Sequence, residues 1–143
     1  MFYDTMIANM RWKLVFYGLG TTLLIAICAV LIGSVLGCTF ALFKISKNKV
    51  LQKISQIYTT VIRGIPMATQ LMIFYFVIFS PIGISNAVLV AIIAFGINSG
   101  AYCTEIFRAG IQGVDAGQTE AGRSLGLSWR QTLVKIVMPQ AFR

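Results

Sequence analysis

Two long, charge-free and mainly apolar stretches dominate the pattern of this chain. The first covers residues 14–43 and the second residues 64–104, and neither contains Lys, Arg, Asp, Glu or His. A helix needs about 20 apolar residues to cross a bilayer. The first stretch therefore predicts one tilted or overhanging span, and the second, which has the turn sequence Ser-Pro-Ile-Gly at 80–83, predicts two. The expected fold is an all-α membrane protein with about three transmembrane helices, near residues 14–43, 65–80 and 87–107.

The composition agrees with a membrane protein. Of the 143 residues, 57% are hydrophobic and 11% are charged, whereas about 25% of the residues in an average soluble domain are charged. Three spans leave little chain for a separate soluble domain, so we expect one transmembrane domain over residues 1–143.

The distribution of charge predicts the orientation in the membrane. The cations behind the formal net charge of +8 are not spread along one solvated face, as nucleic-acid binding requires, but cluster at the ends of the spans. Residues 44–63 and 108–143 carry most of them, and the turn around Pro81 carries none. By the positive-inside rule, both basic segments face the cytoplasm, and the Pro81 turn and the N-terminus lie outside. Arg11 and Lys13 run against this rule.

The residue types argue against an enzyme. The chain has no His and only four acidic residues, and it contains no Ser/His/Asp arrangement and no phosphate-binding G-x-x-x-x-G-K-[ST] motif. We therefore predict no catalytic residue and no metal site, and a membrane enzyme is the poorly supported alternative. The three cysteines are expected to be small packing residues within or at the ends of the spans: Cys28, Cys38 and Cys103.

Glycine pairs within the spans predict close helix packing. Gly33 and Gly37 have the small-xxx-small spacing in the first span, and Gly96 and Gly100 repeat it in the third. Such a pair serves either packing within one bundle or a dedicated dimer motif, and we expect the former.

Between the first two spans, residues 44–63 have the pattern of an amphipathic helix. Gly64 and Pro66 then break the helical pattern before the second span begins. We expect this helix to lie on the inner membrane surface or against a partner. Its apolar residues recur every three to four positions: Val50, Leu51, Ile54, Ile57, Tyr58 and Val61.

Polar residues gather in the second half of the third span. Asn98, Tyr102 and Glu105 follow the spacing i, i+4, i+7, so they share one helix face. Polar groups inside lipid need a cavity or a partner helix. Two interpretations stay open: a translocation pathway, and a hydrogen-bonded seam between helices with Glu105 reaching water. The candidate pathway residues are Arg63, Asn98, Ser99, Tyr102 and Glu105.

After Arg108 the chain is too polar to span the membrane and is punctuated by glycines. Helix formation is expected from Gln118 to Leu125, with Gly126 as the stop. Ser128 is a candidate N-cap for a second short helix over 129–137. Two such helices would form a compact knob to which a soluble partner can bind.

This segment carries Glu120, Ala121 and Gly122, followed by Gly126 and later by Ile136, Met138 and Pro139. It resembles the EAA loop of ABC-transporter permease subunits, whose pattern is Glu-Ala-Ala, a spaced Gly and Ile-x-Leu-Pro. Gly122 replaces the second Ala and Met138 replaces the Leu. Further stretches, together with the loop, are similar to the polar amino acid uptake branch (His/Glu/Gln/Arg/opine type): residues 62–66, 70–71, 98–102, 105–112, 125–128 and 139–141.

The resemblance runs from Leu14 onward and implies part of the type I ABC-importer permease fold, with cytoplasmic coupling helices. It implies a multi-pass subunit of the bacterial inner membrane that translocates a polar amino acid or close analogue. The implied partners are an extracytoplasmic solute-binding protein, a second permease subunit, either identical or homologous, and an ATPase dimer that binds the ATP and Mg²⁺. The implied ATPase-coupling residues are Gly113, Glu120, Ala121, Gly122, Ser124, Leu125, Gly126, Leu127, Ile136 and Pro139.

Family members continue with further transmembrane helices after this loop, whereas the present sequence stops at Arg143. The resemblance therefore implies an incomplete permease. The alternative is a truncated, non-transporting module that docks on a partner through residues 120–126.

Overall fold

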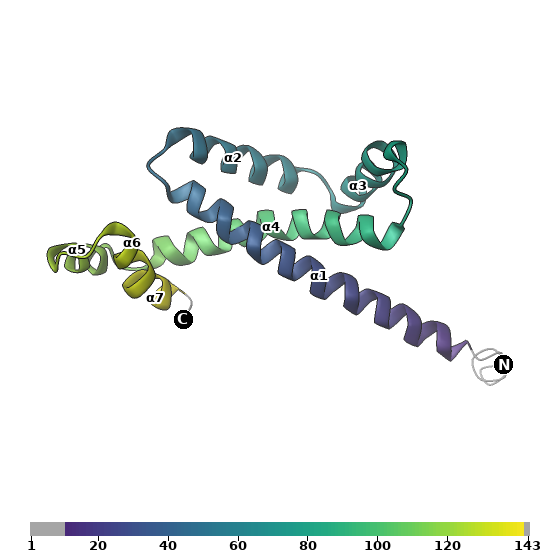
Figure 1. The fold of residues 1–143 in the computed structure, drawn as a ribbon, viewed down its shortest axis with the longest axis horizontal. Helices are drawn as coiled ribbons and strands as arrows, with labels where there is room; N and C mark the ends of the chain where they lie inside the picture. The colour runs from purple at the N-terminus through teal and green to yellow at the C-terminus, as the bar shows by residue number, and fades with distance from the viewer. Residues whose placement is uncertain (1–10, 142–143) are drawn as a thin grey trace.

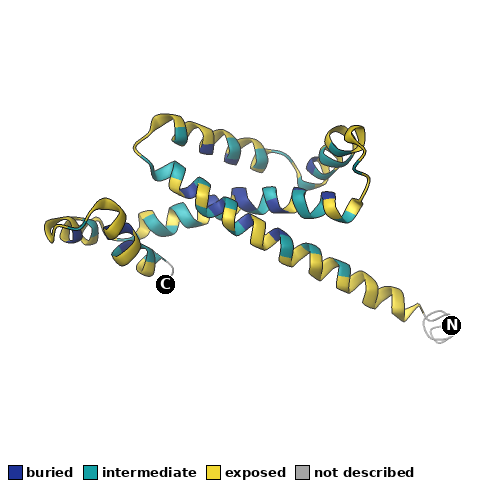
Figure 2. Ribbon diagram, viewed as in Figure 1, coloured by how far each residue is buried: buried dark blue, intermediate teal, exposed yellow. Residues whose placement is uncertain are grey.

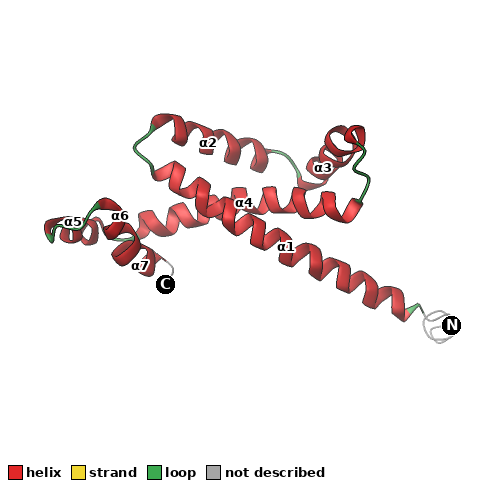
Figure 3. Ribbon diagram, in the orientation of Figure 1, coloured by secondary structure: helices red, strands yellow, loops and turns green. Residues whose placement is uncertain are grey.

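The structure is a computed structural model that describes residues 11–141. Every regular element in this range is helical (Figure 3). Two long helices, α1 (Trp12–Ile45) and α4 (Ala87–Gly113), cross each other, and α2 (Lys49–Gly64) lies beside both (Figure 1). The expected all-α fold is confirmed. The N-terminus, expected outside, and Arg143 lie beyond the described residues, so that expectation stays a prediction.

Helix α1 is the long first span that the sequence predicts. Its 34 residues extend about 50 Å at 1.5 Å per residue, which exceeds the roughly 30 Å of a bilayer's hydrocarbon core. Its N-terminal half is exposed on nearly all sides (Figure 2). A helix that is apolar all round is suited to lipid or to partner helices rather than to water.

The crossing of α1 and α4 is built on small residues. An added Cβ at Gly33 would lie 2.5 Å from Ser99 Oγ, and one at Gly96 would lie 2.8 Å from Ile32 Cγ2. The glycine pairs of the two helices thus face each other within one chain, which agrees with packing inside a bundle. The buried stripe of α1 that lies in this contact consists of Ala29, Gly33, Gly37 and Ala41.

Helix α2 packs its polar side against α1 and α4, and its expected place on the membrane surface or against a partner stays a prediction. Tyr58 donates a 2.6 Å hydrogen bond to the carbonyl of Ile97 in α4, and Ser55 donates a 2.8 Å bond to the carbonyl of Phe40 in α1. The small polar side chains of Ser55 and Thr59 are buried against these helices. The expected amphipathic pattern is present, but its polar side faces the bundle because the neighbouring backbones offer acceptors there. The apolar residues Val50, Ile54, Ile57 and Val61 remain exposed.

The second expected span, residues 65–80, is part of a bent structure. It contains α3 (Met67–Met72), the π-helical η2 (Ile73–Phe79) and the short 3₁₀ helix η3 (Ser80–Ile82). Within residues 11–141, α1 and α4 are the two helices long and apolar enough to span alone. Helix α2 and the stretch Met67–Ile82 reach that length only together, across a 104° bend at their junction. Three crossings therefore require this broken pair to act as one span.

The remaining helices form a small cluster at one end of α4 (Figure 1). They are α5 (Ala116–Ser124), α6 (Trp129–Thr132), the π-helical η4 (Leu133–Val137) and α7 (Met138–Ala141). Gly110 of α4 lies against α7, since a Cβ added there would be 3.0 Å from the carbonyl oxygen of Ala141. The cluster is thereby attached directly to the end of the long helix.

Candidate functional site

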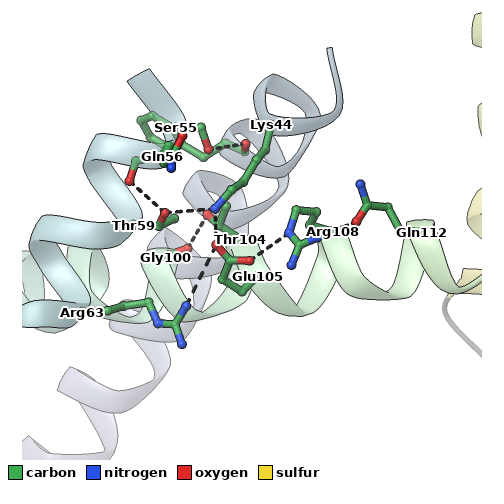
Figure 4. A network of polar contacts seen from close by, with 11 residues as sticks. Lys44, Ser55, Gln56, Thr59, Arg63, Gly100, Thr104, Glu105, Arg108 and Gln112 are labelled. Carbon is green, nitrogen blue, oxygen red and sulfur yellow. Dashed lines mark hydrogen bonds and ion pairs between the residues drawn. The ribbon is translucent and has the colours of Figure 1, made fainter. Parts of the chain in front are cut away.

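Glu105 of α4 is the centre of a charged cluster between α1, α2 and α4. It accepts hydrogen bonds from Lys44 Nζ of α1 and, at 2.8 Å, from Arg108 Nε one turn further along α4. Arg63 of α2 places a guanidinium nitrogen 4.0 Å from the same carboxylate. Figure 4 shows the three cations around Glu105. One negative charge therefore faces three positive charges, and the cluster keeps an excess of positive charge.

Uncharged polar groups extend this cluster into α2. Lys44 Nζ also donates to Thr59 Oγ1 at 3.1 Å, and Thr59 Oγ1 donates to the carbonyl of Gln56 at 3.2 Å (Figure 4). The Arg63 guanidinium lies 5.0 Å from the centre of the Tyr102 ring, a cation–π distance. Lys44, Thr59, Arg63, Tyr102 and Glu105 line a cavity of about 390 Å³.

A second polar contact lies further along α4, towards its N-terminus. Asn98 donates a 2.8 Å hydrogen bond to Gln70 Oε1 of α3. Gln70 is 2% exposed, and its Nε2 has no hydrogen-bond partner among the described residues. Buried amide donors without a partner are costly. The contact therefore places an unused donor next to Asn98.

The predicted pathway residues occupy two neighbouring places. Arg63, Tyr102 and Glu105 belong to the charged cluster, whereas Asn98, Ser99 and Tyr102 line a cavity of about 620 Å³ between α1 and α4. Tyr102 contributes to both cavities. Ser99 also lies in the contact with Gly33. The Asn98–Gln70 bond is a seam of the kind that the second interpretation expects, so the structure contains features of both interpretations.

Sequence reasoning missed Lys44, Thr59 and Gln70 as members of this site. The sequence places Lys44 among the cations at the ends of the spans and Gln70 within one of the stretches that resemble the family. Two features of the sequence could have identified them. Lys44 directly follows the first charge-free run, and Gln70 is a polar residue within the second, mainly apolar run.

The knob after α4 has the expected helix ends. Asp115 caps α5 by accepting a 2.7 Å bond from Gly117 N. Gly126 takes φ +83° as α5 ends, a conformation that glycine adopts without strain. Ser128 caps α6 and exchanges hydrogen bonds with Gln131 in a capping box. The predicted stop at Gly126 and cap at Ser128 are confirmed, and α5 begins at Ala116, two residues before the predicted start.

The proposed coupling residues divide into exposed and internal ones. A Cβ added at Gly122 would lie 2.8 Å from both Thr132 Cγ2 and Ile136 Cδ1. Gly122 therefore allows α5 to pack on its own chain, whereas the resemblance implied a role for it in coupling to the ATPase. Pro139 lies in the first turn of α7, and the helical run from α6 to α7 continues through it without a break. The exposed members are Gly113, Glu120, Ala121, Ser124, Leu125, Gly126 and Pro139, and Leu127 and Ile136 are half-buried.

Comparisons with known proteins agree on one family. Residues 29–143 match the family described as the inner membrane component of binding-protein-dependent transport systems. A probable amino-acid ABC transporter permease protein, YckA of Bacillus subtilis, is 40% identical over 142 residues, 99% of this chain and 62% of the relative. A putative glutamine transport system permease protein, GlnP of Rickettsia prowazekii, is 40% identical over 90% of this chain and 61% of the relative.

A solved structure shares the fold. The crystal structure of an amino acid ABC transporter with histidines superposes with a TM-score of 0.82 at 36% identity, covering 95% of this chain and 64% of that one. The chain thus spans about three fifths of the length of the curated relatives that it matches. Because the family match covers most of the sequence, the chain belongs to the family of inner membrane components of binding-protein-dependent transport systems.

Proposed function

We propose that the chain is a membrane-spanning permease subunit of an ATP-driven importer for a polar amino acid or a close analogue. The observation that carries the proposal is the combination on α4 of a charged, half-buried cluster around Glu105 and an exposed helical knob at the end of the same helix. Membership of the family and the names of the relatives support the same function.

The chemistry of the cluster suits an amino acid. A zwitterion carries a carboxylate and an ammonium group, and the excess positive charge of the cluster, with the Arg63 guanidinium 4.0 Å from Glu105, suits the carboxylate. The unused Gln70 donor beside Asn98 suits an oxygen of the solute. We therefore assign Arg63, Asn98, Ser99, Tyr102 and Glu105 to the pathway and add Lys44 and Gln70 to them.

The remaining parts of the importer are other chains. We assign ATP binding, Mg²⁺ binding and hydrolysis to a dimeric ATPase subunit, delivery of solute to an extracytoplasmic binding protein, and the other half of the pathway to a second permease subunit. In this arrangement α5 lies in the cytoplasm of a bacterial cell and the N-terminus lies outside the cytoplasmic membrane, as the positive-inside rule predicts.

Transport in a reconstituted system tests the proposal. The permease, the ATPase that co-purifies with it and the binding protein are placed in proteoliposomes, and uptake of radiolabelled amino acids is measured with ATP and with a non-hydrolysable analogue. ATP-dependent uptake is expected. Association with the ATPase without uptake would instead favour the interaction module that acts without transport.

Glu120 provides a separate test of coupling. It is exposed on α5, and reversing its charge changes the electrostatic match to the ATPase without disturbing an internal contact. Glu120→Lys is expected to weaken association with the ATPase about tenfold. Lys53→Glu, a charge change of equal size on the exposed part of α2, is the control for membrane insertion. Equal binding of the wild type and Glu120→Lys, measured by co-purification and titration, would remove Glu120 from the coupling surface.

A further inference from the structure

A cavity of about 800 Å³ lies between the turn that joins α1 to α2 and the helical run from α6 to η4. This cavity, here called the basic groove, is distinct from the cavity at the charged cluster, and exposed residues of the knob form one of its walls. Its walls combine apolar side chains with the cations Lys47, Arg123 and Arg130, and within residues 11–141 no acidic side chain lines it. We infer that the basic groove binds an anionic phospholipid, with the phosphate held by these cations and an acyl chain lying against the apolar wall.

The position of the groove fits a lipid headgroup. Lys47 lies two residues after the end of α1, and the groove lies beside the last turn of that span. Basic pockets at the ends of membrane helices on the positively charged side attract anionic headgroups. Trp129 also lines the groove and is 46% exposed, and tryptophan is enriched at the level of the headgroups.

The apolar wall continues from the groove along the span. Leu42 of the groove shares a face of α1 with Val35 and Leu31, at spacings of seven and four residues. All three side chains are exposed, with Val35 at 68%. An acyl chain whose phosphate lies in the groove can therefore follow this face of the helix. A soluble phosphate compound has no apolar chain to cover this face, so a lipid is the favoured occupant.

The charge balance of the groove supports an anion. Glu105, the acidic residue in the third span, already has Lys44, Arg63 and Arg108 around it. The groove cations are exposed, and Arg123 keeps part of its donor capacity after its 2.9 Å bond to the carbonyl of Leu127. Guanidinium groups recognise phosphate oxygens with two parallel hydrogen bonds. The groove cations therefore attract the negative charge of a phosphodiester, and the described acidic residues do not neutralise these cations.

Native mass spectrometry of the protein purified in mild detergent tests the inference. Cardiolipin, phosphatidylglycerol and phosphatidylcholine are titrated in separate experiments, and retained lipid is counted. The wild type is expected to retain the anionic lipids preferentially. Lys47→Gln/Arg130→Gln is expected to lower the affinity for them about 30-fold. Lys49→Gln/Lys53→Gln, which removes two cations of α2 that lie outside the groove, is the control and is expected to keep the preference.

A photo-crosslinking residue in place of Val134, which lines the groove and is 60% exposed, identifies the occupant. A lipid adduct that free glycerol phosphate does not displace supports the inference. An adduct with another protein, or with a further segment of this protein, overturns it, as does equal loss of anionic lipid in both double variants. Transport activity does not enter these readouts, so failure here leaves the proposed function standing.

Discussion

Glu105 is the residue on which the charged contacts of three helices converge. It pairs with Lys44 of α1 and with Arg108 of its own helix, and Arg63 of α2 is 4.0 Å away. Among the described residues, Glu105 is the only carboxylate within ion-pair distance of these three cations. The three cations consequently depend on a single carboxylate, since a charge shielded from water needs a partner.

Removing that carboxylate is expected to destabilise the protein. Glu105→Gln keeps the size of the side chain but leaves Lys44, Arg63 and Arg108 facing one another without an anion. The side chain of Glu105 is 21% exposed, so the loss is smaller than for a fully buried pair, at about 2 kcal/mol in the free energy of unfolding. Denaturation in mild detergent, followed by circular dichroism, measures it.

A double-mutant cycle identifies the cause. If the loss comes from unbalanced charge, Lys44→Gln in the Glu105→Gln background restores part of the stability, and the two changes are not additive. Lys135→Gln, an exposed cation of η4, serves as the control and is expected to add independently. Full additivity of Glu105→Gln and Lys44→Gln would contradict the assigned ion pair.

For single residues, the sequence predicts which side chains share one helix face better than it predicts which residues of other helices they contact. The spacing of Asn98, Tyr102 and Glu105 follows from the geometry of a single helix, and all three contact other helices or line cavities in the structure. Lys44 and Gln70 could not be assigned to the site, because their distance to α4 depends on how three helices cross. Helix periodicity is local, whereas crossing geometry is not.

Among the elements, α1 and α4 depend on glycine for their close contact. Gly33→Ala is expected to force the helices apart, because its Cβ would lie 2.5 Å from Ser99 Oγ and 3.1 Å from Gly100 N. The expected loss is about 1–3 kcal/mol of stability. The same measurement of unfolding in mild detergent applies.

Gly18→Ala is the matched control on the same helix. A Cβ at Gly18 meets none of the described residues within 4 Å, and alanine has the higher helix propensity. This variant is therefore expected to be at least as stable as the wild type. A loss at Gly18 equal to that at Gly33 would mean that the effect belongs to glycine in a helix and not to the crossing.

The sequence predicts long helices well and bent ones poorly. The charge-free runs predict both ends of α1 to within two residues and the start of α4, but α4 continues past the expected end at residue 107 to Gly113. The orientation of α2 could not be predicted, because burial of Ser55 and Thr59 depends on carbonyl acceptors that neighbouring helices supply. The π-helical turns of η2 and η4 have no signal in the hydrophobic pattern, since they change the hydrogen bonds and not the residue types.

For the whole molecule, the central question is whether the pair of α2 and Met67–Ile82 crosses the membrane or turns back. Single cysteines at Ser46, Ser85 and Ser128, in a background without Cys28, Cys38 and Cys103, distinguish the two. If the pair crosses once, Ser46→Cys and Ser128→Cys react with an impermeant thiol reagent from one side of the membrane, and Ser85→Cys reacts from the other.

A re-entrant pair gives a different labelling pattern. Ser85→Cys would then react from the same side as Ser46→Cys, and Ser128→Cys from the opposite side. Wild-type labelling and a total count after solubilisation control for expression and burial. The positive-inside rule predicts the first pattern, with the Ser46 side facing the cytoplasm.

Helix α4 has no break between Ala87 and Gly113. Asn98 lies fifteen residues from the end that carries the knob, a distance of about 22 Å along the axis. A rigid rod of that length multiplies small rotations: a tilt of about 5° at the knob displaces the Asn98 level by about 2 Å. That displacement exceeds the tolerance of a 2.8 Å hydrogen bond such as the one to Gln70. A tilt of that size at the knob would therefore break, by leverage alone, the Asn98–Gln70 contact in the middle of the bundle.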